Sequence, residues 1–409
     1  VRWIEIISGA RGKGKGKASY KVAANTGLRA REGSYTIGDQ TITVTQAGAE
    51  ATLTFAHFAL GGGWSSLVSL TNPSRSETAT GFVTFYHDAG EPLFVSINGE
   101  ASSGRAMFSI APLGSATLSV DGTGSLVTGW AQVDGDIPIG GVMTITSPEG
   151  KVATVEESLP YRALMIPVVK DDEGGETAIA LANLHAGEVE LELSLRTLKG
   201  EEVAGGSTSL TLPVRGHVAR FIHELFPDAD TVGFEGTVSI SAAREEERIA
   251  AAALQVGTAD GGFSALPVVG LDPEVTETTL YFAQYGGGGG WSSWLLLINP
   301  FSATVSEASI FDEKGRPVSW GDEGGKERVV LAIPARGGAR LATEENSQFV
   351  TGTARVRADG PIAGVLRIKS PELGTWRVGA SQPMPGFIVP VTRSILGQWS
   401  TAVAIASVG

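Results

Sequence analysis

Hydrophobic and polar residues alternate in short stretches along most of the chain, and glycine, proline, asparagine and aspartate separate the stretches. A period of two is typical of β-strands with one buried face, and the separating residues are those that form tight turns. In the first part of the chain the pattern predicts strands at residues 52–58, 64–71, 81–87, 92–97, 106–110, 116–120, 127–133 and 141–146. Seven or eight short antiparallel strands within roughly a hundred residues predict a two-layer sandwich.

The same pattern returns along the chain together with its landmark residues. The phrase GGGWSSLVSLTNP around Trp64 recurs as GGGGWSSWLLLINP around Trp291, and a weaker copy, GETAIALANL, lies between them. Equivalent landmarks follow in the same order: Asn72, Asn183 and Asn299; Gly90, Gly200 and Gly315; Pro112, Pro213 and Pro334; Gly129, Gly236 and Gly352. The spacing, roughly 100 to 120 residues, is the length of one sandwich domain. The sequence therefore predicts tandem copies of one building block.

These repeats predict an all-β protein made of tandem immunoglobulin-like antiparallel β-sandwich domains arranged as a rod. We assign the repeats to residues 51–160, 161–273 and 274–384. An incomplete fourth repeat is expected at 385–409, because Phe387–Val391 resembles Leu164–Val168 and Thr401–Ala406 resembles Thr177–Ala182. The connecting segments are short, so the modules are not expected to swing freely.

The first fifty residues form a separate unit. Alternation predicts strands at 3–7, 18–24, 33–37 and 41–46, and the Gly-Lys series at 11–17 predicts a turn. This segment of the sequence contains a set of residues that are typical of one known domain family: Trp3-Ile4, Ser8-Gly9, Gly12, Tyr20, Ala24-Asn25, Arg31, Gly33 and Thr43–Gly48. In these residues it resembles the C-terminal part of a BACON domain, an immunoglobulin-like module of secreted bacterial proteins, over residues 1–48. The remainder resembles uncharacterised tandem β-sandwich repeats of exported bacterial proteins.

The resemblance implies further strands before Trp3, which this sequence lacks. A sandwich without them would expose an apolar groove and unpaired backbone groups. We expect either a fragment of a longer polypeptide or a subunit completed by a strand from its neighbour. The family is linked to suspected carbohydrate or mucin binding, but the resemblance carries no sugar-binding residue to this chain.

Composition and charge narrow the classes of function. The 409 residues include 55 glycines and no cysteine, so disulfides, thiolate metal sites and a cysteine nucleophile are excluded. The net charge of −13 argues against nucleic-acid binding. Residues 1–50 carry eight basic and four acidic side chains, or +4, which leaves −17 for the rest (−13 − 4). No apolar stretch is long enough to span a membrane, so membrane insertion is not expected.

No enzyme motif stands out in the sequence. The histidines occur singly and offer no paired metal-ligand spacing: His57, His87, His185, His217 and His223. The serines beside glycine lack the context of a nucleophile elbow, and no Gly-Lys-Ser/Thr follows the glycine run at 286–290. Asp134 with Asp136, and 171–173, lack the spacing of a calcium loop. We therefore predict no catalytic residue, no metal and no cofactor.

The candidate binding residues are tryptophans and lysines. Trp64, Trp291 and Trp399 occupy one position in their repeats, and Trp294 is added in the third. These rings either stack on sugars or pack between successive modules, and a repeated junction favours packing. Lys13, Lys15 and Lys17 form a candidate anionic-ligand loop, although a solvated turn explains them more simply.

The repetition itself predicts the function. Repeated copies of one fold set the length of a protein and the number of its equivalent binding sites, whereas catalysis usually needs a single specialised pocket. We therefore expect a non-enzymatic structural or adhesive protein of a bacterial surface or extracellular filament, with self-association or neighbouring domains of a longer chain as partners. The alternative is a carbohydrate-binding accessory region of a larger secreted enzyme or adhesin, with a polysaccharide as the partner.

Overall fold

The chain is built almost entirely of antiparallel β-sheets. The computed structural model describes residues 3–9, 17, 19–22, 31–37, 40–46, 51–101, 104–122, 124–169, 175–257, 263–271, 278–320, 326–343, 348–372, 374–381 and 404–407. Across these residues the only helix is α1 (Ile222–Leu225), a single turn. The prediction of an all-β chain made of sandwiches is confirmed.

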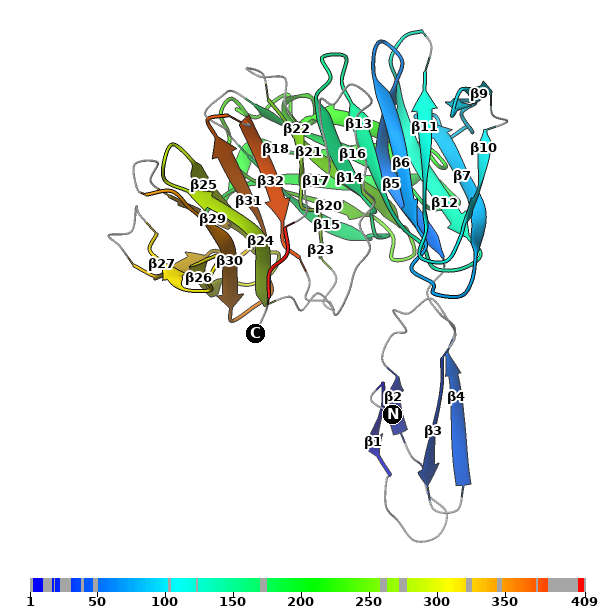
Figure 1. Ribbon diagram of the computed structural model, residues 1–409, viewed down its shortest axis with the longest axis horizontal. Helices are drawn as coiled ribbons and strands as arrows, with labels where there is room; N and C mark the ends of the chain where they lie inside the picture. The colour runs from blue at the N-terminus through cyan, green and yellow to red at the C-terminus, as the bar shows by residue number, and fades with distance from the viewer. Residues whose placement is uncertain are drawn as a thin grey trace.

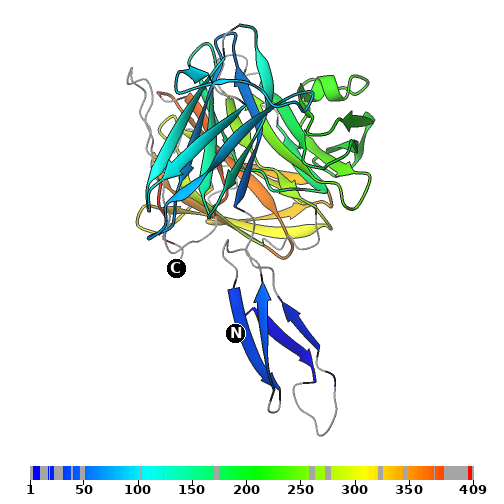
Figure 2. The same cartoon turned by 90° about the vertical axis from the view of Figure 1, so that its right-hand side faces the viewer.

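The N-terminal strands form two antiparallel pairs that project away from the rest of the molecule (Figures 1 and 2). Strand β1 (Ile4–Ser8) pairs with β2 (Ser19–Val22), and β3 (Arg31–Ile37) pairs with β4 (Gln40–Gln46). Three large apolar side chains of these strands, Ile7, Tyr20 and Ile42, are exposed to solvent.

Module 1 spans residues 52–156 and has two sheets. One sheet has the order β10-β7-β12-β5, and the other has the order β14-β13-β6-β11, extended by β8 and β9. The strands are β5 (Thr52–Leu60), β6 (Ser65–Thr71), β7 (Ala79–His87), β8 (Ser96–Ile97), β9 (Glu100–Ala101), β10 (Arg105–Ile110), β11 (Ser115–Asp121), β12 (Val127–Gly135), β13 (Gly140–Thr146) and β14 (Val152–Glu156). Strand β14 was not predicted, and the strand expected at 92–97 is shortened to β8.

Module 2 spans residues 163–270 and repeats this topology. Its sheets have the orders β18-β17-β20-β15-β23 and β19-β16-β21-β22. The strands are β15 (Ala163–Val168), β16 (Glu176–Asn183), β17 (Val189–Thr197), β18 (Glu202–Leu212), β19 (His217–Phe221), β20 (Gly236–Ala242), β21 (Ile249–Val256), β22 (Phe263–Leu266) and β23 (Val269–Gly270). We call the sheet that contains β5 or β15 the first-strand sheet, and the sheet that contains β6 or β16 the second-strand sheet.

Module 3 spans residues 279–379 and has the same plan. Its first-strand sheet has the order β24-β30-β26, with β27 and β28 both paired to β26, and its second-strand sheet has the order β29-β25-β31-β32. The strands are β24 (Thr279–Gly287), β25 (Ser292–Ile298), β26 (Thr304–Asp312), β27 (Pro317–Val318), β28 (Arg328–Ile333), β29 (Gly338–Ala342), β30 (Val350–Ala358), β31 (Ala363–Ser370) and β32 (Gly374–Gly379).

The three modules stack face to face in a row, as Figure 1 shows. The first-strand sheet of module 1 lies on the second-strand sheet of module 2, with β5 against β16 and β21, and β12 against β19. Strand β16 serves two hydrophobic clusters: Ile179 and Leu181 belong to the core of module 2, whereas Ala180 and Ala182 belong to the cluster of module 1. Both faces of this sheet are therefore buried.

The second junction is built in the same way. In β25, Leu295 and Leu297 face the core of module 3, whereas Trp294 and Leu296 join the hydrophobic cluster of module 2. A strand buried on both faces reads as an unbroken apolar run, which explains the sequences AIALA and WLLLI. The equivalent β6 of module 1 still alternates, SSLVSLT, because the outer face of its sheet has no neighbouring module among the described residues. Where the sequence predicted a rod, the structure thus has a row of sandwiches joined through their sheet faces.

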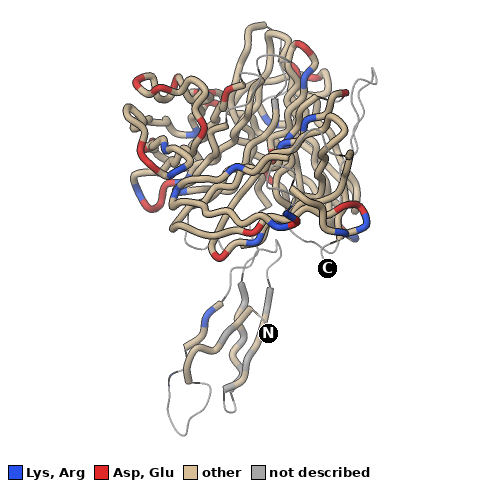
Figure 3. The backbone as a smooth tube through the Cα atoms, turned by 90° about the vertical axis from the view of Figure 1, so that its left-hand side faces the viewer, with Lys and Arg blue, Asp and Glu red and all other residues tan. Residues whose placement is uncertain are grey.

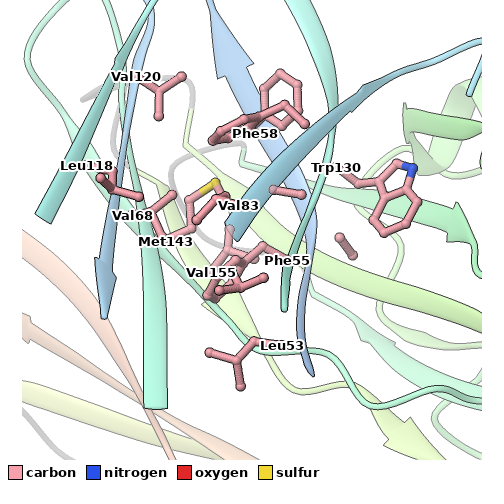
Figure 4. Packing of buried hydrophobic residues seen from close by; sticks show 14 of the residues in the cluster. Leu53, Phe55, Phe58, Val68, Val83, Leu118, Val120, Trp130, Met143 and Val155 are labelled. Carbon is pink, nitrogen blue, oxygen red and sulfur yellow. The ribbon is translucent and has the colours of Figure 1, made fainter. Parts of the chain in front are cut away.

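The core of module 1 shows how a strand divides its side chains between two layers (Figure 4). Phe58, Val83 and Met143 gather between the two sheets of the module. Trp130 of β12 points away from that group, toward the strands of module 2. Charged residues lie mainly in turns and at sheet edges, and the stacked strands carry few of them (Figure 3).

The double burial of β16 leads to the first prediction. Ala180→Asp places a carboxylate between modules 1 and 2 with no partner, which should lower the free energy of unfolding by roughly 3 kcal/mol or more. The matched control is Thr117→Asp, which adds the same charge to the exposed outer face of β11 in module 1. Urea denaturation of both variants measures the difference, and equal losses would contradict a buried sheet-to-sheet contact.

Candidate functional site: the junction between modules

Each junction is centred on a tight turn of one module that rests on a turn of the next. The first turn ends in Gly90 in module 1 and in Gly200 in module 2, with φ of +88° and +80°. A Cβ at Gly90 would lie 2.0 Å from the carbonyl oxygen of Val214, and a Cβ at Gly200 would lie 2.2 Å from that of Ala335. No other residue fits here, because backbone of the next module occupies the space and the left-handed conformation already favours glycine.

The receiving turn has the form Pro-Xaa-Arg-Gly in both junctions, at 213–216 and 334–337. Arg215 and Arg336 adopt positive φ, 56° and 54°, and this conformation turns their carbonyl groups toward the preceding module. The residue after the glycine then donates a backbone hydrogen bond across the junction. His217 N donates to Asp88 O at 2.9 Å, and Gly338 N donates to Leu198 O at 2.8 Å.

A side chain of the preceding module completes the docking. The indole Nε1 of Trp130 donates to Arg215 O at 2.7 Å, and the hydroxyl of Thr237 donates to Arg336 O at 2.9 Å. Trp130 and Thr237 directly follow the equivalent glycines Gly129 and Gly236. The two junctions thus share one hydrogen-bond scheme, although the side chains that supply it differ.

The linker between modules 1 and 2 is bonded to both of them. Ser158 N donates to Thr54 O of module 1 at 2.7 Å, and its hydroxyl accepts a bond from Ala251 N of module 2 at 2.8 Å. Tyr161 and Ile249 exchange two backbone hydrogen bonds of 2.8 Å. Because its backbone is paired on both sides, this linker holds the two modules in one orientation.

The first junction also contains a chain of titratable groups. His217 Nδ1 lies 2.8 Å from Asp88 Oδ1, and His217 Nε2 lies 3.4 Å from His57 Nδ1. The two imidazole rings stack with centroids 5.4 Å apart. Thr128 donates its hydroxyl to the Asp88 carboxylate at 3.1 Å. With Asp88 ionised, His217 Nδ1 donates a hydrogen bond to it, so Nε2 of a neutral His217 accepts a hydrogen bond from His57 Nδ1.

Burial and hydrogen bonding shift the pKa values of His57 and Asp88 in this cluster. Burial, with a smaller contribution from the neighbouring His217, lowers the pKa of His57 to about 3, so His57 is neutral near pH 7. Burial raises the pKa of Asp88, but hydrogen bonds from His217 and Thr128 more than offset this effect and leave it below the usual value. The hydroxyl at this cluster binds the carboxylate and not a ring nitrogen, so the order of groups that activates a nucleophile is not formed here.

The sequence interpretation of the histidines missed this cluster. It found no paired metal-ligand spacing among the five, but the structure brings His57 and His217 together from modules 1 and 2, 160 positions apart. The available signal was positional: Asp88 lies in the docking turn and His217 directly follows the receiving turn. At the second junction the equivalent residues are Leu198 and Gly338, so the titratable chain belongs to the first junction.

The candidate tryptophans fall into two groups. Trp294 is 4% exposed and packs at the second junction, where the Arg340 guanidinium lies 4.8 Å from its ring centre and contacts Glu235 of module 2 at 3.4 Å. Trp64 and Trp291 lie at equivalent places on the cores of their own modules, each bridged to a glycine of the preceding loop. Trp399 lies outside the described residues.

Trp291 belongs to a partly exposed aromatic group in module 3. Its ring centre lies 5.2 Å from Phe349 and 5.6 Å from Trp376, and Phe349 is 47% exposed. The glycine run before Trp291 packs within this module, because a Cβ at Gly289 would lie 2.9 Å from Phe349.

The remaining candidates are placed as follows. Lys17 is exposed, whereas Lys13, Lys15 and residues 171–173 lie outside the described residues. Asp136 accepts hydrogen bonds from the backbone N and the hydroxyl of Thr80, both at 2.7 Å, and so stabilises a turn. Among the residues that the structure describes, no group of three or more metal-ligating side chains occurs, and no helix is long and apolar enough to cross a membrane.

The docking turns lead to a comparison of three glycines. Gly315 occupies the same turn in module 3 with φ +75°, but no atom of the described residues would lie within 4 Å of a Cβ there. Asparagine tolerates this conformation, so Gly315→Asn should cost about 1 kcal/mol or less. Gly90→Asn and Gly200→Asn must also displace backbone of the next module, and each should cost roughly 2 kcal/mol more than Gly315→Asn. Chemical denaturation provides the ranking, and three equal losses would refute the docking role.

The buried histidine predicts acid sensitivity. His57 binds a proton below about pH 3 in the folded state but at 6.5 when unfolded, so stability falls as the pH drops between these values, by at most about 1.4 kcal/mol per pH unit. The lowered pKa of Asp88 acts in the same direction, since its stabilisation is lost as the pH falls through the folded-state value. His57→Asn should flatten the dependence measured by urea denaturation from pH 7 to 4. The control Thr117→Asn, which changes an exposed residue that does not titrate, should leave it unchanged.

Comparison with protein-family models, with curated proteins and with solved structures gives no match for this chain. The junction is therefore supported by its own repetition, since two copies of the same geometry occur within one molecule.

Proposed function

We propose that this protein is a non-catalytic structural element, a stack of β-sandwich modules that serves as a stiff spacer or adhesive scaffold on a bacterial surface or in an extracellular filament. The observation that carries the proposal is the repeated junction. Sheet burial, turn-on-turn docking and paired hydrogen bonds recur between modules 1 and 2 and between modules 2 and 3. A scaffold needs modules at fixed orientations, and these junctions provide them.

The assignment of residues 1–48 to a BACON-like module is part of this proposal. The support is the resemblance in sequence, together with the antiparallel strand pairs β1–β2 and β3–β4. The exposed Ile7, Tyr20 and Ile42 are consistent with a unit that packs against further strands. Export from the cell follows from the same resemblance.

A second candidate function is carbohydrate binding by module 3. The aromatic group of Trp291, Phe349 and Trp376 favours it, because partly exposed rings stack on the C–H faces of sugars. Gln284 adds an amide beside these rings, since its Oε1 accepts a bond from Trp376 Nε1 at 3.4 Å. Module 1 has Leu126 and Ala153 at the places of Phe349 and Trp376.

Small-angle X-ray scattering of the purified chain tests the scaffold function. A stiff stack predicts one set of distances for modules 1 to 3 that does not change with salt, because apolar burial and backbone hydrogen bonds are screened far less than surface charges. Scattering that requires freely jointed modules would contradict the proposal. Ala180→Asp is the matched variant that should loosen the first junction alone.

Affinity electrophoresis in polysaccharide gels tests the alternative. Carbohydrate binding predicts retardation of the wild-type chain that is lost in Phe349→Ala and kept in Leu126→Ala, because only the first change removes a ring from the aromatic group. If the wild-type chain is not retarded, or if both variants are retarded equally, carbohydrate binding by this aromatic group is rejected and the scaffold is the one candidate function that remains.

A further inference from the structure

Module 3 carries one half of a junction that is not occupied within the described residues. Its turn after β26 has the hydrogen bonds of the two docked turns: Gly315 N donates to Asp312 O at 2.9 Å, as Gly90 N donates to His87 O and Gly200 N to Thr197 O, both at 2.8 Å. Around the docked glycines the next module leaves no space for a Cβ, whereas the space around Gly315 is open. The turn is therefore built for docking, and none of the described residues covers it.

The other parts of this half-junction are also present. Thr353 directly follows Gly352 and so stands where Trp130 and Thr237 stand at the two occupied junctions. Trp130 and Thr237 are buried by the next module, whereas Thr353 is only half-buried. Its hydroxyl has the chemistry of Thr237, which donates to a receiving turn.

The chain also leaves module 3 along the path used before. Ser381 N donates to Tyr281 O at 2.7 Å, so the exit segment pairs with the edge of β24. In the same way Ser158 N pairs with Thr54 O at the edge of β5, and Leu271 N with Ala163 O at the edge of β15. In both earlier cases the chain continues into the module that covers this sheet.

The sequence identifies the chemistry of the missing partner. Residues 401–406, TAVAIA, repeat 177–182, TAIALA, the strand that places Ala180 and Ala182 against module 1. In the structure Ala404, the equivalent of Ala180, is exposed and Ala406, the equivalent of Ala182, is half-buried. Ile405, the equivalent of the core residue Leu181, is also exposed, so this segment has no sandwich packed on it among the described residues.

We propose that module 3 docks a further sandwich of the same repeat, which has residues 385–409 as its first part and presents an alanine-lined second-strand sheet and a Pro-Xaa-Arg-Gly turn. This inference rests on the scaffold function proposed above and names its partner. A second copy of the chain is a poorer fit, because module 1 offers a second-strand sheet with Ser69, Thr71 and Thr117 at the places of Ala180, Ala182 and Ala219. Its receiving turn also has Leu113 in place of arginine.

A lengthened chain tests this docking. Residues 1–406 are followed by a second copy of residues 183–271, so that the fourth repeat becomes a complete sandwich. Cysteines replace Glu313 and the His217 of the added copy, the equivalents of the contacting pair Asp88 and His217. The natural chain has no cysteine, so an intramolecular disulfide formed under mild oxidation reports this contact alone.

We expect the disulfide to form at least tenfold faster than in two controls. The first control moves one cysteine from position 313 to the exposed Val232, and the second adds Gly315→Asn to the original pair to block docking. Rates equal to those of the controls would overturn the proposal, and so would disulfides between two chains, because these would make a second copy the partner.

A second measurement does not depend on the cysteines. Gly315→Asn should be nearly neutral in the 409-residue chain but should destabilise the lengthened chain as Gly90→Asn does, and equal effects in both chains would count against docking. The scattering of the 409-residue chain separates the two proposals. A stiff stack of modules 1 to 3 combined with a failed cross-link would refute the docking partner and leave the scaffold function standing.

Discussion

The structure depends on sheets that are buried on both faces. In β16 and β21, alternate side chains serve two different clusters, so the same strand stabilises its own sandwich and the one before it. Apolar burial is the main stabilising term in folding, and removing either neighbour would return an alanine-lined or tryptophan-containing face to water. The modules are therefore not independent folding units, because each sheet at a junction needs the neighbouring module to bury its second face.

Burial alone would let two flat sheets slide, and the turns set their register. At both junctions a backbone N–H and a carbonyl of the receiving turn are bonded to the preceding module. The donor side chain is Trp130 in one case and Thr237 in the other, and these residues share nothing but a donor group. The backbone path, rather than a particular side chain, is thus the common element, and glycine is required only where two backbones touch.

The strands, the sandwich class and the repetition could be predicted from the sequence, because a period of two reports directly which side chains face a core. Strand β14 escaped prediction because VATVE has only five residues, although its polar and buried residues do alternate. The face-to-face stacking was missed although WLLLI and AIALA carried its signal, since an unbroken apolar run shows that both faces are buried but not what covers the second face. The contact between His57 and His217 required the relative placement of two modules, which no local pattern provides.

The different side chains at the two junctions give the stack an order. Asp88 meets His217 at the first junction, whereas Leu198 meets Gly338 at the second. If module 1 docked on module 3, the half-buried Asp88 would face Gly338 and lose the imidazole that stabilises its charge. If module 2 docked on another copy of itself, Leu198 would cover His217 and remove its carboxylate. Each exchange leaves a polar group without its partner, which costs more than the bond itself contributes. A common backbone scheme therefore makes stacking general, and the few polar side chains decide which module follows which.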